Sequence, residues 1–170
     1  MSAPGALLYD ADQIAAAVDR LAAEIVPHYA GLELTAVVVL DGALIFAADL
    51  LRRLPVPTRV ETVKVTSYAA DRQSEVQFLA GPPILAGRHL LIIDDILDSG
   101  RTLAALRARL TAERPASLRS CVLLDKPSRR QIDVPIEWRG LEVPDCFVVG
   151  YGLDFDGRYR NLPSIARLED

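Results

Sequence analysis

Three short apolar runs, separated by helix-like segments, constrain the fold of this chain most strongly. The runs are TAVVVL (35–40), HLLIIDD (89–95) and SLRSCVLLD (117–125), and such continuously apolar runs are typical of strands buried on both faces. Helix-like segments at 43–54 and 101–113 follow the first two runs. Because strands and helices alternate, the sequence predicts an α/β fold with a central, mainly parallel sheet.

Two further segments complete the expected order of elements. Residues 10–30 form an amphipathic pattern, with Asp10 as a candidate helix cap and Gln13 three positions later. Residues 59–68 alternate with a period of two and predict a strand. Residues 69–83 are polar and interrupted, as in a mobile hairpin or loop, so a lid is predicted there.

Length and composition indicate one folded domain. A chain of 170 residues fits one domain, and we find no internal repeat or linker. The 19 basic and 23 acidic residues give a net charge of −4, which argues against a polyanion-binding surface. The last third is less regular and is predicted to pack as a subdomain on the sheet edge.

Cysteine, histidine and apolar patterns indicate a cytoplasmic protein. Cys121 and Cys146 lie in strand-like runs, as reduced and buried thiols do. His28 and His89 are isolated, so we predict structural roles and no zinc site. The N-terminal residues lack the pattern of a signal peptide, and charged residues interrupt every apolar run well before the length of a membrane span.

The segment LLIIDDILDSGRTL (90–103) concentrates the polar chemistry. If residues 90–93 are a buried strand, Asp94 and Asp95 lie at its carboxyl end, and 98–102 form the turn into the next helix. The amides at a helix start bind anions, and Gly100 lets a phosphate approach the backbone. Ligands of α/β proteins bind at this end of the strands.

Acids beside a phosphate site are consistent with a ligand that also carries sugar hydroxyls and a divalent cation. A ribose phosphate with magnesium meets both conditions. The alternative is that Asp94 and Asp95 only end a strand, while Asp98 or Ser99 caps the following helix. The sequence contains no GxxxxGK[ST] motif, which argues against a P-loop ATPase.

The stretch IIDDILDSGRT resembles the phosphoribosyl-pyrophosphate signature of type I phosphoribosyltransferases. Three other segments, in the same order, resemble the hypoxanthine-guanine branch: VVVLDGALIFAADLLRRL, LLDKPSRR and FVVGYGLDFDGRYRNLP. The resemblance implies a Rossmann-like fold in a single domain (1–170), with a small hood formed by the N-terminal segment and roughly 130–170. It implies a purine salvage glycosyltransferase that uses Mg²⁺ to make IMP or GMP and pyrophosphate from 5-phosphoribosyl 1-pyrophosphate and hypoxanthine or guanine.

The resemblance also assigns the phosphate half of the site. Asp98 would be the catalytic acid or base near the purine imidazole nitrogen. Asp94 and Asp95 would bind the ribose hydroxyls and the metal. The 5′-phosphate would be bound by Ser99, Gly100, Arg101 and Thr102, and the pyrophosphate by residues at Asp41, Gly42 and Arg160.

The base half follows from the same resemblance. Lys126 would donate to the six-position oxygen and select oxopurines over adenine. Phe147 would stack on the base, the backbone of Val148 would meet the two-position group, and Asp154 would help to hold a second metal. Taken singly, each of these residues also has an explanation without a ligand. Lys126 could be a surface residue that follows a strand, and Arg160 a solvated charge. An apolar strand that ends in a turn explains FVVG equally well.

Two positions depart from the family pattern. Asp41 stands where relatives often carry Lys or Arg beside a non-proline cis peptide, so pyrophosphate contacts there would come from backbone groups near Gly42. Asp94 replaces a frequent Glu. Ser67 and Tyr68 match the start of the family's mobile loop, which closes over the reacting carbon.

Alternative functions stay open at this point. The same phosphate site could serve xanthine, adenine or a pyrimidine, although GYGLDF and LLDK favour 6-oxopurines. A regulator of this fold could bind RNA, but that needs a basic face. The expected partners are therefore small molecules, with no nucleic acid and no membrane, and the apolar surface of 43–54 predicts a homodimer or homotetramer.

Overall fold

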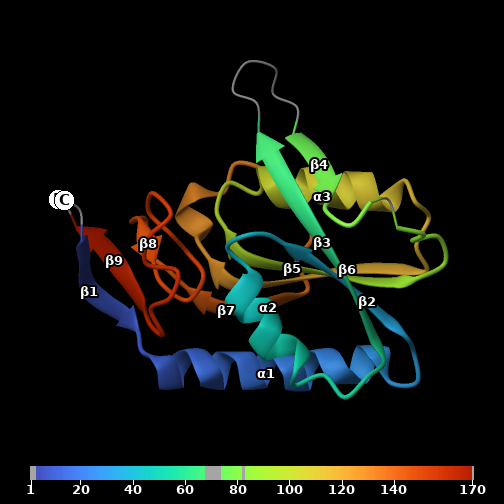
Figure 1. Cartoon of the computed structure of the whole chain (residues 1–170), viewed down its shortest axis with the longest axis horizontal. Helices are drawn as coiled ribbons and strands as arrows, with labels where there is room; N and C mark the ends of the chain where they lie inside the picture. The colour runs from blue at the N-terminus through green and yellow to red at the C-terminus, as the bar shows by residue number, and fades with distance from the viewer. Residues whose placement is uncertain (1–2, 68–73, 82, 170) are drawn as a thin grey trace.

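A six-stranded sheet forms the centre of the molecule in the computed structural model, which describes residues 3–67, 74–81 and 83–169 (Figure 1). The strand order is β4-β3-β2-β5-β6-β7. Only the β3–β4 pair is antiparallel, so the predicted mainly parallel α/β sheet is confirmed. The strands are β2 (Leu34–Val39), β3 (Thr58–Ser67), β4 (Ser74–Phe78), β5 (His89–Leu97), β6 (Ser117–Asp125) and β7 (Trp138–Glu142).

Helices cover both faces of this sheet. The helices α1 (Ala11–Tyr29) and α2 (Leu44–Leu51) pack on one face, and α3 (Arg101–Thr111) packs on the other (Figure 1). In β5, Leu91 and Ile93 face the first core, whereas Leu90 and Ile92 face the second. All four are fully buried, which explains why this strand reads as a continuous apolar run.

The start of α1 has the predicted capping box. The amide of Gln13 donates to the Asp10 carboxylate at 2.8 Å, and the Asp10 amide donates to the Gln13 side chain at 3.0 Å. Other boundaries differ slightly from those predicted. The helix expected at 43–54 covers 44–51, and β5 extends two residues beyond the predicted end, so that Asp94 and Asp95 lie inside it.

A small second sheet has the order β1-β9-β8, with β1 (Ala3–Tyr9), β8 (Val148–Val149) and β9 (Ile165–Glu169). Its pairs are antiparallel, and Ala3 pairs with Glu169. We propose that this sheet and the loops around it form the hood. Within the range expected for the hood, β7 belongs to the large sheet, where Trp138 pairs with Cys121.

A short 3-10 turn, η1 (Pro127–Arg129), connects β6 to the loop before β7. Cys121 is buried in β6, whereas Cys146 is half-buried in the loop before β8 and not in a strand as predicted; both are free thiols. Among the described residues, no helix is long and apolar enough to cross a membrane.

Candidate active site

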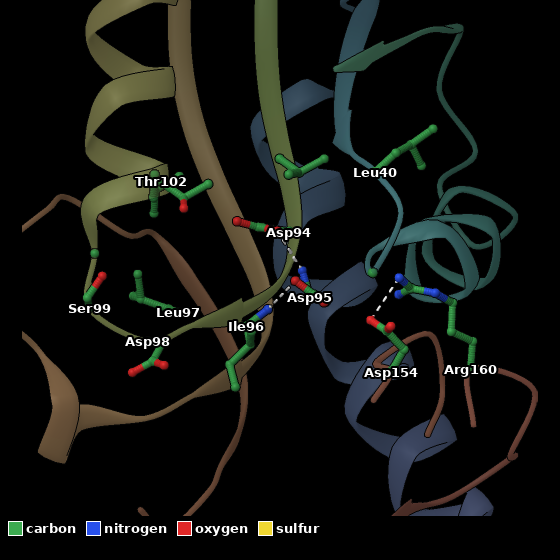
Figure 2. Close-up of a pocket in the computed structure, with 14 residues that line it drawn as sticks. Leu40, Asp94, Asp95, Ile96, Leu97, Asp98, Ser99, Thr102, Asp154 and Arg160 are labelled. Carbon is green, nitrogen blue, oxygen red and sulfur yellow. Dashed lines mark hydrogen bonds and ion pairs between the residues drawn. The ribbon is translucent and has the colours of Figure 1, made fainter. Parts of the chain in front are cut away.

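The acid pair lies at the carboxyl end of β5, the central strand of the site (Figure 2). The Asp95 amide donates to the Asp94 carboxylate at 3.0 Å, and the Ile96 amide donates to the Asp95 carboxylate at 2.9 Å. Burial and the neighbouring Asp95 charge raise the pKa of Asp94 well above its usual range. Burial also raises the pKa of Asp95. The fold therefore keeps two carboxyl groups where the charged forms are disfavoured, as is common at functional sites.

The turn after β5 has the geometry of an anion site. Gly100 precedes α3 with φ of +86°, a backbone conformation that favours glycine. A Cβ at this position would also lie 2.5 Å from the carbonyl oxygen of Ile132. The Arg101 amide donates to the Ser99 hydroxyl at 3.3 Å, while the Arg101 side chain is exposed.

A cavity of about 290 Å³ lies beside this turn, close to the lower end of volumes for small-molecule sites. Figure 2 shows Asp98 and Ser99 on the turn, with Asp154 and Arg160 across the cavity. Of the predicted site residues, nine line this cavity: Gly42, Asp94, Asp95, Asp98, Ser99, Gly100, Thr102, Asp154 and Arg160.

The turn after β2 forms another wall of the cavity. The peptide bond between Leu40 and Asp41 is cis. Gly42 lies directly against Asp95, whose carboxylate occupies the space that a Cβ at Gly42 would need. The Asp41 carboxylate does not line the cavity and instead lies 3.3 Å from the ammonium of Lys64.

Residues 152–160 close the cavity from the side of the small sheet. The Arg160 guanidinium pairs with Asp154 at 2.8 Å and donates to the Gly152 carbonyl at 2.6 Å. Gly152 has φ of +103°, and a Cβ there would collide with the Gly42 carbonyl oxygen. This close approach places Arg160 and Asp154 beside the turn after β2.

A second cavity, of about 180 Å³, adjoins the first and is lined by Lys126, Phe147 and Val148. Lys126 is 6% exposed, and its ammonium donates to the Cys146 carbonyl at 2.9 Å. Phe147 is 54% exposed, and its ring meets that of Phe155 edge to face, with centroids 5.7 Å apart. A buried lysine and an exposed aromatic ring thus line the same recess.

Asp98 joins the two cavities, since it lines both. One of its carboxylate oxygens, Oδ1, is buried and accepts no hydrogen bond from the described residues. The Nε of Arg129 lies 3.3 Å from this oxygen, and the same guanidinium lies 3.5 Å from Asp145. This oxygen therefore has a charged neighbour but no hydrogen-bond donor among the described residues, while the Asp98 side chain as a whole is 42% exposed.

The sequence matches the phosphoribosyl transferase domain family over residues 6–156. The chain belongs to the phosphoribosyltransferase family. A hypoxanthine phosphoribosyltransferase of Haemophilus influenzae is 38% identical over 95% of this chain and 94% of its own length. A hypoxanthine-guanine phosphoribosyltransferase of Mycobacterium avium is 41% identical over 96% of this chain and 85% of its own.

Solved structures agree with these relatives. The crystal structure of a hypoxanthine-guanine phosphoribosyltransferase from Bacillus anthracis superposes with a TM-score of 0.92 at 33% identity and covers both chains completely. The predicted fold class, the membership of the hypoxanthine-guanine branch and the assignment as a transferase enzyme are therefore confirmed.

Not every residue assigned through the family resemblance reaches a cavity. The side chains of Asp41 and Arg101 line neither one, and Ser67 is the last residue of β3. Tyr68 and, within the lid predicted at 69–83, residues 69–73 and 82 lie outside the described residues. Two residues of the site region, Arg129 and Arg130, were not predicted, although LLDKPSRR contains both, because an arginine in a loop carries no signal that distinguishes it from a solvated charge.

The donor set fits the magnesium ion that the family uses in general. Among the described residues, no three side chains of His, Cys, Asp or Glu are grouped to hold a metal. Asp94 and Asp95 would supply two carboxylates, and Mg²⁺ is often held by one or two carboxylates with substrate phosphates and water. Asp154 already binds Arg160 and the Gly157 amide, so its predicted place at a second metal stays a proposal.

Proposed function

We propose that the enzyme joins hypoxanthine or guanine to 5-phosphoribosyl 1-pyrophosphate, and releases pyrophosphate with IMP or GMP. The position of Asp98 carries this proposal, because it lies between a cavity suited to a ribose phosphate and a recess suited to a flat oxopurine. Hypoxanthine and guanine are the bases named for the relatives. The proposed role is purine salvage.

The phosphate half would hold the sugar through three elements. Asp94 and Asp95 would accept hydrogen bonds from the ribose hydroxyls. Backbone amides of the turn at 98–102 would bind the 5′-phosphate, with Ser99 and Thr102 adding hydroxyl donors. Magnesium, when bound at the acid pair and the pyrophosphate, would stabilise the charge of the leaving group.

The pyrophosphate would lie between Gly42 and Arg160. We propose that the backbone at Gly42 donates to it and that Arg160 neutralises part of its charge. The Asp41 side chain would take no direct part, because it faces Lys64 and away from the cavity. Lys64 would offset the charge of Asp41 at this end of the turn.

The proposed chemistry has an oxocarbenium-like transition state, as in other glycosyl transfers. The base would attack the anomeric carbon through an imidazole nitrogen as the pyrophosphate leaves. As the new bond forms, Asp98 would take the proton from the neighbouring imidazole nitrogen, because its partly exposed carboxylate lines both cavities. The other residues named would act by holding the two substrates in line.

We propose that Lys126 selects the base, and that the hydrogen bond from its ammonium to the Cys146 carbonyl positions it to do so. This bond fixes the ammonium at the recess, where its remaining hydrogens would donate to a six-position oxygen and would oppose the amino group of adenine. In Lys126→Met, we expect kcat/KM for hypoxanthine and guanine to fall about a hundredfold, with a smaller change for adenine. Steady-state rates with each base measure this, and an unchanged ratio of the rates would reject the assigned role.

Gly42→Ala tests the turn beside the acid pair. The new Cβ would displace the Asp95 carboxylate, so we expect the KM for phosphoribosyl pyrophosphate to rise about tenfold or more. Gly31→Ala is the matched control. Gly31 has φ of +75°, but a Cβ there would meet no atom within 4 Å, so this substitution adds backbone strain away from the site. Equal kinetic effects in the two variants would show that general destabilisation is the cause.

The deciding experiment is nucleotide formation from phosphoribosyl pyrophosphate, with hypoxanthine, guanine, xanthine and adenine offered separately. We expect product with the first two bases, and loss of product when magnesium is chelated. Product only with xanthine or adenine would reassign the base, and no product with any base would refute the proposal.

We also propose a cytoplasmic location and a homodimer or homotetramer. The two free cysteines support a reducing compartment. Leu44, at the start of α2, is 59% exposed, so this helix has apolar surface that the described core does not cover. Sedimentation equilibrium would give the oligomeric state directly.

A further inference from the structure

Arg130 packs against the proposed phosphate turn and lines neither cavity. Its side chain is only 19% exposed and ion-pairs with the Asp125 carboxylate at the end of β6. Its Nε donates to the Asp98 carbonyl oxygen at 3.1 Å, and its Nη2 donates to the Leu97 carbonyl oxygen at 3.2 Å. One guanidinium thus holds two successive carbonyls of the turn, and Asp125 holds the guanidinium.

The backbone after Arg130 extends the same support by one residue. The amides of Gln131 and Ile132 both donate to the Ser99 carbonyl oxygen at 3.0 Å. The carbonyl of Ile132 also packs against Gly100, where a Cβ would not fit. Three consecutive carbonyls, those of residues 97, 98 and 99, are therefore held by residues 130–132.

This support determines where the amides of the turn point. In a trans peptide, the carbonyl and the following N–H belong to one plane and point in opposite directions. Holding the carbonyls of residues 97–99 on one side turns the N–H groups of Asp98, Ser99 and Gly100 to the other. Among the described residues, none of these three N–H groups donates to a protein acceptor. They are free for an anion, as in other backbone nests.

We propose that Arg130 is a positioning residue, which pre-forms the phosphate-binding turn and orients Asp98 without touching a substrate. Arg130 lines neither cavity, so its effect would pass through the backbone that it holds. The planar guanidinium suits this role because it reaches two carbonyls and a carboxylate at fixed angles, which an ammonium does not. This inference rests on the proposed binding of the 5′-phosphate by the turn.

The first test is direct binding without catalysis. Titration calorimetry with ribose 5-phosphate, which lacks base and pyrophosphate, is expected to give a Kd about tenfold to a hundredfold higher for Arg130→Lys and Arg130→Met than for the unaltered enzyme. Binding of ribose 5-phosphate is independent of turnover, so it tests the turn even if the proposed reaction is wrong. In turnover assays, we expect a higher KM for phosphoribosyl pyrophosphate and a lower kcat, with little change in the KM for the base.

Arg139→Met is the matched control. The Arg139 guanidinium also pairs with Asp125, at 3.6 Å, but makes no contact with the turn. Affinity for ribose 5-phosphate close to that of the unaltered enzyme is expected in this variant. If Arg130→Met does not fold, Arg130→Lys keeps the buried charge and decides the question. Unaltered affinity in folded Arg130→Lys, or an equal loss in Arg139→Met, would overturn the proposal.

Discussion

Asp98→Asn is expected to lower kcat by about a hundredfold to ten-thousandfold, the range that general acid–base catalysis typically contributes. The amide keeps the shape of the carboxylate but cannot accept a proton from the purine. Folding should be little affected, because the charge partner of Asp98 is Arg129, and both side chains are largely exposed, at 42% and 53%. Steady-state kcat and the thermal midpoint Tm, measured together, test this prediction.

Asp145→Asn provides the control for this variant. Asp145 shares Arg129 with Asp98 but lines neither cavity. Its replacement removes the same kind of ion pair and should leave kcat near that of the unaltered enzyme. A kcat for Asp98→Asn within about threefold of the unaltered value would remove Asp98 from the proton transfer, since catalysis of this kind contributes far more.

Asp94→Asn is expected to raise Tm at neutral pH while it lowers activity. Burial and Asp95 raise the pKa of Asp94 in the folded state, so the folded protein binds the proton more tightly than the unfolded chain does. Stability therefore falls as pH rises from the unfolded pKa near 3.8 through the raised folded pKa, and the cost is complete above that value. Removing this charge should stabilise the fold by about 1 to 2 kcal/mol, or about 2 to 8 °C in Tm.

The pH dependence of Tm shows whether the ionisation of Asp94 causes the difference in stability. The difference in Tm between Asp94→Asn and the unaltered enzyme should shrink as pH falls toward and below the unfolded pKa near 3.8, where Asp94 becomes protonated in both states. Asp133→Asn, at an exposed position, should show no such difference. The increase in Tm that magnesium and phosphoribosyl pyrophosphate give together should also be smaller in Asp94→Asn. A lower Tm for this variant at pH 7 would contradict the explanation.

The central sheet and the acid pair could be predicted from the sequence because their signals are local. β2, β5 and β6 are buried on both faces, so each gives a continuous apolar run, and the polar residues at their ends stand out. By contrast, β1 reads APGALLY and is mostly exposed, and it becomes a strand only through its pairing with β9. No local pattern reports a partner so distant in sequence.

The same distinction, between local sequence signals and contacts that are distant in sequence, applies to the site. The assigned roles of Asp94 to Thr102 depend on one contiguous motif. The pairing of Asp41 with Lys64, and of Tyr151 with Asp49 through a 2.5 Å hydrogen bond, joins residues from different elements. Arg130 could not be predicted for a related reason, since its partners are mostly backbone carbonyls, which every residue has. Such contacts follow from the packing of the folded chain.

The small sheet links the proposed base recess to β1 and β9, the first and last strands of the described chain. The Leu168 amide donates to the Phe147 carbonyl at 2.9 Å, and β9 in turn pairs with β1. The residues of the phosphate turn and their strands, by contrast, lie between 34 and 132. During synthesis, the residues of the proposed phosphate turn and of its backbone support would therefore all be present before β9, with which β8 at the proposed base recess must pair.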